Sequence, residues 1–292
     1  MLRRLLVPAL LLAAASATRA QEAKTEPSPV DQAMEDFKAG EYAKVVADLE
    51  DLPAEDPRYP KAQYLVGESW LALGDGEVAE KVFRGLLAKK PDSSPLLAGV
   101  GRALTLQGKP DEAMEFLKKA VKADPKDAAA RRAVGECLAA QNKPAEARKE
   151  LEAAVRLDPK DPLTARALVE VCVRAGDTGA AGKAAEALRQ ADPKSGMGDF
   201  LVGLALDRKG DSKGAIAAYE AALAKDPKLL DSHKNLAILC IADNPTYQDK
   251  ERTKKALEHF AKYFELGGKD EELRKLYEQI KSFAAPGTPT GR

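Results

Sequence analysis

The chain has 292 residues, with 46 basic and 46 acidic side chains, so its formal net charge is zero. This neutral balance excludes bulk electrostatic binding to nucleic acid, which requires a strongly basic face. With 3 Cys, 21 Gly and 18 Pro, the composition also excludes disulfide-framework and collagen-like proteins. Abundant Ala and only 5% aromatic residues favour helix over strand.

Residues 1–20 have the pattern of a secretory signal peptide. Two arginines near the start precede an apolar run that ends at Ala15, and small residues follow. Cleavage after Ala17 or after Ala20 fits this pattern. The apolar run is shorter than the ~20 residues that span a bilayer comfortably. We therefore expect an exported chain, periplasmic or extracellular, without an integral membrane span after cleavage. An uncleaved membrane anchor is the alternative.

The body of the chain repeats every 34 residues. Six prolines follow one another at this spacing, namely Pro57, Pro91, Pro125, Pro159, Pro193 and Pro227. A second row at the same spacing holds only Gly or Asn, namely Gly40, Gly74, Gly108, Asn142, Gly176, Gly210 and Asn244. Gly and Asn tolerate the left-handed conformation that ends a helix, and Pro cannot continue one. The repeated unit is therefore helix, tight turn, helix and loop.

Further rows indicate how the two helices of a unit pack. Small residues recur in the first helix at Gly67, Gly101, Gly135, Val169, Gly203 and Ala237, and in the second at Ala79, Ala113, Ala147, Ala181 and Ala215. Four positions after the second row stand Phe83, Leu117, Leu151, Ala185 and Tyr219. We expect the large side chains to fill the space beside the small ones. One such helix pair cannot bury its own apolar face, so neighbouring units must stack.

These rows resemble the tetratricopeptide repeat family. The segment from Pro60 supplies Gly67, Trp70, Ala79, Phe83 and Pro91 in the family's order, and the segment from Met197 supplies Gly203, Ala215, Tyr219, Ala222 and Pro227. The resemblance covers about 26–267 and implies an all-α fold, a right-handed superhelical solenoid of antiparallel helix pairs. Seven units start near residues 26, 60, 94, 128, 162, 196 and 230.

The repeat array is expected over 30–267, after a polar linker at 21–29. Residues 268–284 form a C-terminal capping helix that covers the exposed end of the stack. Residues 285–292 read as a disordered tail. The seventh unit carries seven extra residues before Ala256, and Pro245 suits the first turn of a lengthened second helix.

No constellation of catalytic residues is found. Residues 210–214 satisfy G-x-S-x-G, but a nucleophile elbow needs a preceding strand, and Asp211 or Ser212 more simply caps a helix. His233, Cys240 and His259 suggest a three-ligand metal site as a remote alternative, against the reading that Cys240 fills an inward slot. The three cysteines are expected to be buried free thiols. We expect no enzyme activity, no cofactor and no metal, and an enzyme or metal-binding protein remains a remote alternative.

The family resemblance implies that the first helices of the units line a concave binding groove. The candidate groove residues are Tyr64, Glu68, Arg102, Arg132, Glu136, Arg166, Glu170, Arg174, Phe200, Arg208 and Lys234. Arg side chains suit carboxylates and Phe suits an apolar anchor, so a peptide with acidic groups and one apolar side chain would fit. The alternative is that Arg132–Glu136 and Arg166–Glu170, each four residues apart, satisfy one another on a solvated helix face.

The carboxylate clamp of some family members is not expected. Lys234 and Asn235 occur together, but Ile238 stands where a clamp Asn would be. The resemblance implies a non-catalytic scaffold or adaptor with a protein or peptide as its partner. The signal-peptide pattern places it in the cell envelope, and the neutral charge excludes nucleic acid. A structural subunit of an envelope assembly, for secretion, pilus formation or polysaccharide export, is the alternative. Partner identity and oligomeric state stay open.

The signal-peptide prediction is tested by expressing the full chain in an export-competent bacterium. We expect the envelope fraction to hold a chain that begins at Thr18 or Gln21, measured by intact-mass spectrometry. A chain that retains residues 1–20 in the membrane fraction would instead support the uncleaved anchor.

Overall fold

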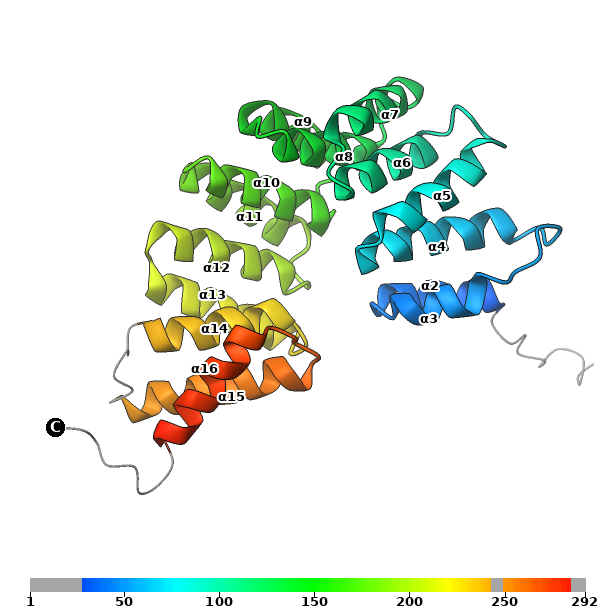
Figure 1. Ribbon diagram of the computed structural model, residues 1–292. Coiled ribbons are helices and arrows are strands. Elements are labelled where there is room, and N and C mark those ends of the chain that lie inside the picture. The colour runs from blue at the N-terminus through cyan, green and yellow to red at the C-terminus, as the bar shows by residue number, and fades with distance from the viewer. Residues whose placement is uncertain (1–27, 243–248, 285–292) are drawn as a thin grey trace, which may run out of the picture. The chain divides into compact units, whose positions relative to one another are not determined.

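The computed structural model describes residues 28–242 and 249–284. The predicted signal peptide, the C-terminal tail and residues Asn244 and Pro245 lie outside the described residues. Within these ranges the chain forms fifteen helices and no strand (Figure 1). None of these helices has both the length and the apolar character needed to cross a bilayer.

The helices follow one another in antiparallel pairs, and the chain divides between Leu86 and Leu87 into two compact units. The first unit contains α2 (Pro29–Lys38), α3 (Tyr42–Leu49), α4 (Tyr59–Leu73) and most of α5 (Gly76–Leu87). The second contains α6 (Ser94–Leu106), α7 (Pro110–Ala123), α8 (Ala128–Ala140), α9 (Pro144–Leu157), α10 (Pro162–Arg174), α11 (Thr178–Ala191), α12 (Met197–Lys209), α13 (Ser212–Lys225), α14 (Leu230–Ala242), α15 (Lys250–Glu265) and α16 (Glu271–Ala284). The all-α solenoid of paired helices is confirmed.

The turn inside each pair follows the predicted Gly and Asn row. Every described member of that row has a positive φ, and Asn142, at φ 59°, is the one described residue other than Gly that does so. After α8 ends, the Lys143 N–H donates to the Leu138 carbonyl at 2.9 Å and the Asn142 N–H donates to the Ala139 carbonyl at 3.1 Å. These bonds supply donors to carbonyls at the end of α8 that have no hydrogen-bond partner within the helix.

Aspartates begin several of the helices. The Asp127 carboxylate accepts from the Ala130 N–H, and the Asp211 carboxylate accepts from the Gly214 N–H, each at 2.9 Å. Asp211 therefore caps α13, and the G-x-S-x-G segment follows a helix, α12, rather than a strand. The predicted cap is confirmed, and the segment lacks the strand that a nucleophile elbow requires.

Small and large side chains meet between the helices of a pair, as predicted. A Cβ added at Gly135 would lie 2.6 Å from the Leu151 Cγ, and one added at Gly203 would lie 2.6 Å from the Tyr219 Cε1. In the fifth pair the volumes are exchanged, since Val169 on α10 and Ala185 on α11 are both fully buried. The large residue has moved to the first helix of that pair and the small one to the second.

The last pair and its cap form one apolar cluster. Phe260 of α15, Ala237 of α14 and Ile280 of α16 are fully buried together. Leu273, Leu276 and Tyr277 of α16 pack against this cluster, so α16 covers the last pair as the apolar spacing predicts (Figure 1).

Two predicted boundaries are wrong. Asp249 has an extended backbone and caps α15 through the Arg252 N–H, so α15 begins at Lys250 and not near Pro245, which lies outside the described residues. At the other end, Ser28 is the N-cap of α2 and Pro29 its first residue, so these two residues belong to the first helix and not to the linker.

The contact between Gly135 and Leu151 generates a stability prediction. Gly135→Ala places a Cβ against Leu151 and the Ala147 carbonyl, which costs about 1–3 kcal/mol and exceeds the ~1 kcal/mol gained in helix propensity. Gly182→Ala on α11 is the matched control, because its Cβ meets no atom within 4 Å. In urea unfolding, we expect the free energy of unfolding to fall for Gly135→Ala and to rise by ~0.5–1 kcal/mol for Gly182→Ala. Equal effects would contradict the proposed close contact.

Candidate functional site

A groove of about 860 Å³ lies along the first helices of three successive pairs, α10, α12 and α14. We call it the α10–α12–α14 groove. Its lining residues are Arg166, Glu170, Val173, Arg174, Phe200, Leu204, Asp207, Arg208, Asp231, Lys234, Asn235, Ile238, Leu239 and Ala242. It brings together six of the eleven predicted groove residues, namely Arg166, Glu170, Arg174, Phe200, Arg208 and Lys234.

The 34-residue period arranges most of this lining in three rows. The first row is Arg166, Phe200 and Lys234; the second is Glu170, Leu204 and Ile238; the third is Arg174, Arg208 and Ala242. Successive rows are separated by four residues, about one helical turn, so they follow one another along the helix axes. Leu204 and Ile238 of the second row thus lie between cations of the first and third rows, on the two groove helices that follow that of Glu170.

Arg166 joins two of the three helices across the groove. Its Nη1 lies 3.2 Å from the Asp231 Oδ2 on α14, 65 residues further along the chain, and its Nε donates to the Glu170 Oε1 at 2.9 Å. Two carboxylates therefore neutralise this guanidinium. The predicted Arg166–Glu170 pairing is present, and Asp231 adds a partner that the sequence analysis did not name.

Three other cations of the groove keep their donors available. Among the described residues, the side chains of Arg174, Arg208 and Lys234 make no ion pair and no hydrogen bond with the rest of the chain. Arg174 and Arg208 are exposed at the same row of neighbouring helices. Guanidinium groups in such positions bind carboxylates through two parallel hydrogen bonds.

Phe200 forms part of the groove floor and not a projecting anchor. Its side chain is only 3% exposed and packs on the Tyr219 ring at a centroid distance of 5.8 Å. Burial raises the pKa of the Tyr219 hydroxyl, which stays neutral and accepts a hydrogen bond from the Asn235 side chain at 3.1 Å. The exposed apolar side chain of the groove is Ile238, which is 37% exposed.

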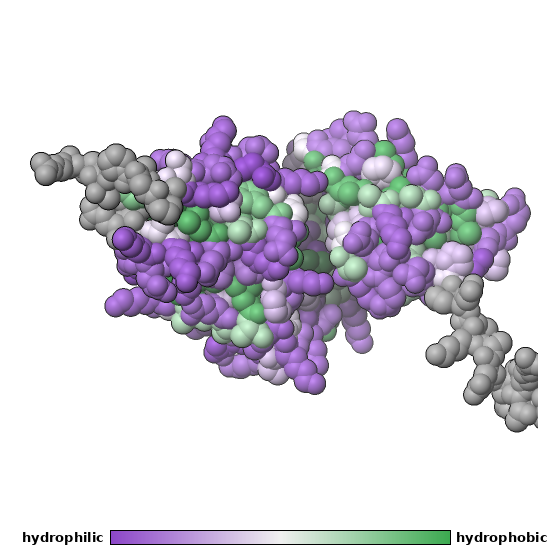
Figure 2. Space-filling view, turned by 90° about the horizontal axis from the view of Figure 1, so that it is seen from below, coloured by the Kyte–Doolittle hydropathy of each residue, from purple (hydrophilic) through white to green (hydrophobic). Residues whose placement is uncertain are grey.

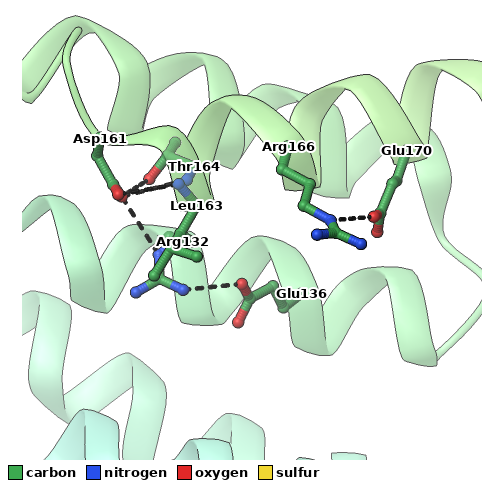
Figure 3. A network of polar contacts seen from close by, with 7 residues as sticks. All are labelled: Arg132, Glu136, Asp161, Leu163, Thr164, Arg166 and Glu170. Carbon is green, nitrogen blue, oxygen red and sulfur yellow. Dashed lines mark hydrogen bonds and ion pairs between the residues drawn. The ribbon is translucent and has the colours of Figure 1, made fainter. Parts of the chain in front are cut away.

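Arg132 serves a different purpose from the one predicted. Its side chain is only 10% exposed, and it lies 3.1 Å from Glu136 on its own helix and 3.5 Å from Asp161, which caps α10 (Figure 3). Asp161 also binds the Thr164 hydroxyl and backbone N–H groups at the start of α10. Arg132 therefore fastens α8 to the beginning of α10, and it does not line the α10–α12–α14 groove.

The remaining candidates lie on other helices. Tyr64 and Glu68 are on α4 of the first compact unit, where the Tyr64 ring packs edge-on against Phe83 at 5.8 Å. Arg102 is on α6 and Glu136 on α8 of the second unit. None of these four belongs to the lining of the α10–α12–α14 groove.

The sulfur and imidazole groups do not form the three-ligand site considered from the sequence. Cys137, Cys172 and Cys240 are all free and buried, as predicted, and burial raises the pKa of each thiol. His233 and His259 contact each other and not Cys240, with 2.9 Å between their Nδ1 atoms. The described part of the chain holds no group of three side chains that would bind a metal ion.

Three polar residues that line the groove are not among the predicted candidates, namely Asp207, Asp231 and Asn235. Asp231 and Asn235 are four residues apart and share a helical face, and Lys234 on that face was already a candidate. The acid in the first turn of α14 matches an ordinary helix start, so the sequence carries no signal for its contact with Arg166. On the face seen in Figure 2, polar and charged side chains predominate and apolar residues show as small patches.

Comparisons with known proteins agree with this fold. Two family models described as tetratricopeptide repeat match the chain, one over residues 104–171 and the other over residues 30–94 and 167–229. Together these matches cover more than half of the chain. No curated protein sequence matches it.

Solved structures give the same fold at low identity. A chain of the APC/C hetero-tetramer Cut9–Hcn1 is similar with a TM-score of 0.58 and 16% identity, over 93% of this chain and 52% of that one, so this chain spans about half its length. A tetratricopeptide repeat protein from Parabacteroides merdae has a TM-score of 0.57 and 12% identity, covering 87% and 97%. PilW, a type IV pilus biogenesis factor, has a TM-score of 0.52 and 24% identity, covering 68% and 92%. At these identities the likeness shows the fold alone.

The different burial of Arg132 and Arg166 generates a prediction. Both pair with a Glu four residues on, but the Arg132 side chain is 10% exposed and that of Arg166 is 43% exposed. We expect Arg132→Ala to lower the free energy of unfolding by about 1–3 kcal/mol, because the partly buried Glu136 and Asp161 carboxylates lose a partner and the largely buried arginine side chain loses its packing. Arg166→Ala should cost less than ~1 kcal/mol. Chemical denaturation measures both, and the reverse order would contradict the fastening role of Arg132.

Proposed function

Because the chain belongs to the tetratricopeptide repeat family, we propose that it is a non-catalytic protein-interaction scaffold of the cell envelope. Its α10–α12–α14 groove binds a peptide segment of a partner protein. The observation that carries this proposal is the set of unpaired cations around Leu204 and Ile238 in that groove.

The groove chemistry favours an acidic segment. Arg174, Arg208 and Lys234 offer free donors, whereas the Arg166 guanidinium is already shared between two carboxylates. Leu204 and Ile238 provide apolar contact between these cations. A segment with an aliphatic or aromatic side chain between two carboxylates would therefore match both the charge and the apolar surface of the groove.

The envelope location rests on residues 1–20. A positive start, an apolar run and a small-residue cleavage site are typical of a secretory signal peptide, which delivers the chain to the periplasm or the exterior. After cleavage, the scaffold would act there as a soluble partner of envelope proteins.

A second candidate function is that of a structural subunit in an envelope assembly. PilW, whose structure resembles this chain, is a type IV pilus biogenesis factor. In such a role, another surface of the solenoid or the capping helix α16 would make the contact, and the groove would not be required.

The two functions are separated by a pull-down from crosslinked envelope extract with the chain from Gln21 as bait. The test variant is Arg174→Ala/Arg208→Ala. We expect it to lose the partner, with affinity reduced about a hundredfold, because each of the two lost guanidinium–carboxylate pairs is worth roughly 1.4 kcal/mol, or about a factor of ten. Quantitative mass spectrometry of the captured proteins measures the loss.

The matched control is Lys183→Ala/Lys209→Ala, which removes the same charge from exposed positions of α11 and α12 that line a different hollow. Capture should survive this control and should fall with rising salt. A partner retained by the Arg174/Arg208 variant would refute recognition in the groove and favour the structural-subunit function.

A further inference from the structure

The only two histidines of the chain meet at the contact between α14 and α15. Their Nδ1 atoms are 2.9 Å apart and their ring centroids 5.2 Å apart. The Nε2 of His233 lies 3.0 Å from the Pro227 carbonyl in the turn between α13 and α14. His233 is only 8% exposed. One imidazole thus connects its own helix, the preceding turn and the following helix.

The partners determine where the ring protons lie. A carbonyl oxygen only accepts, so the His233 Nε2 must carry a proton and donate it to Pro227. In a neutral ring the His233 Nδ1 is then an acceptor, and the proton between the rings belongs to the His259 Nδ1. The structure therefore assigns the Nε2–H tautomer to His233 and the Nδ1–H tautomer to His259.

This arrangement limits how many protons the closed pair can hold. One added proton fits on the His259 Nε2, which makes no hydrogen bond with any described residue, and the contact between the rings survives. A second would have to go on the His233 Nδ1, where it faces the Nδ1–H of His259 at 2.9 Å. Two donors pointing at each other cannot form a hydrogen bond, so the doubly charged pair must separate.

The surroundings disfavour even the first proton. Burial, the nearby His233 and Lys255 lower the pKa of His259 to about 4, and Glu258 and Glu220 act in the opposite direction. Lys255 of α15 is itself paired with Glu220 of α13. In the turn before α14, the Asp226 carboxylate is occupied by the Lys228 N–H. On α14 itself, Asp231 and Lys234 flank His233 in sequence and line the groove.

We propose that the His233–His259 contact is an acid-sensitive joint that holds α14 against α15, and that its protonation loosens the C-terminal wall of the α10–α12–α14 groove. The consequence for peptide binding rests on the proposed function, whereas the joint itself does not. In the opened joint His259 takes up a proton near the ordinary histidine pKa of ~6.5, whereas in the closed joint its pKa is about 4, so the closed state loses stability as the pH falls from about 6.5 towards 4.

The joint is tested by hydrogen–deuterium exchange of the chain from Gln21 at pH 7.5 and pH 5.5, corrected for the intrinsic exchange rate and with no partner present. The lowered pKa of His259 in the closed state favours opening about tenfold over this interval, so we expect ~10-fold faster exchange in α14, α15 and α16. Helices α8 and α9 contain no histidine and serve as the internal control. Equal pH effects in both regions would overturn the proposal.

His259→Asn is the matched variant, because its side-chain amide can still donate to the His233 Nδ1 but does not titrate. It should remove most of the acceleration in α14–α16. An unchanged ~10-fold acceleration would refute the role of the pair. If this variant does not fold, the tautomers remain decisive: nitrogen NMR of the unmodified chain at pH 7.5 must show one Nε2–H and one Nδ1–H histidine. Two histidines of the same tautomer would overturn the proposal.

These measurements use no ligand, so they distinguish the joint from the groove. If acid opens the joint but the pull-down captures no partner, the proposal about the joint stands and only the proposed function is refuted. A captured partner with no acid-dependent opening would refute the joint alone.

Discussion

The architecture depends on how closely the two helices of a pair approach. A Gly or Ala on the first helix leaves room for one large side chain from the second, as Gly135 does for Leu151 and Gly203 for Tyr219. Because this contact recurs every 34 residues, successive first helices present equivalent positions to one another. The three rows of the α10–α12–α14 groove result from that repetition. The site is therefore a consequence of backbone packing and not a separate local motif.

Local signals made the fold predictable and left much of the site unpredicted. Helix ends depend on a few adjacent residues, so Asn142 and Asp211 could be assigned from sequence, whereas the start of α15 at Lys250 could not. The site depends on which side chains meet after the units stack. Arg166 and Asp231 are 65 residues apart, and neither spacing nor composition indicates that they form an ion pair.

The same limit explains why similar pairs differ in role. Arg132 and Arg166 each precede a Glu by four residues, and the sequence treats them alike. The start of α10 lies over Arg132 and buries it, whereas Arg166 faces the groove and reaches α14. Burial set by the neighbouring unit thus separates a cation that joins two helices in the interior from one that lines the α10–α12–α14 groove. Helix α14 has two kinds of contact. One side of it lines the groove, and His233 joins it to His259 of α15.

The exchanged volumes of the fifth pair restrict which helices of this array can pack together. Val169 and Ala185 are both fully buried at the positions that Gly and Leu occupy in the third and fourth pairs. Joining α10 to the second helix of the fourth pair would place Val against Leu and overfill the contact. Joining α8 to α11 would place Gly against Ala and leave a void. Each first helix is therefore matched in volume to its own second helix, and the helix pair is the smallest unit in which these volumes are complementary.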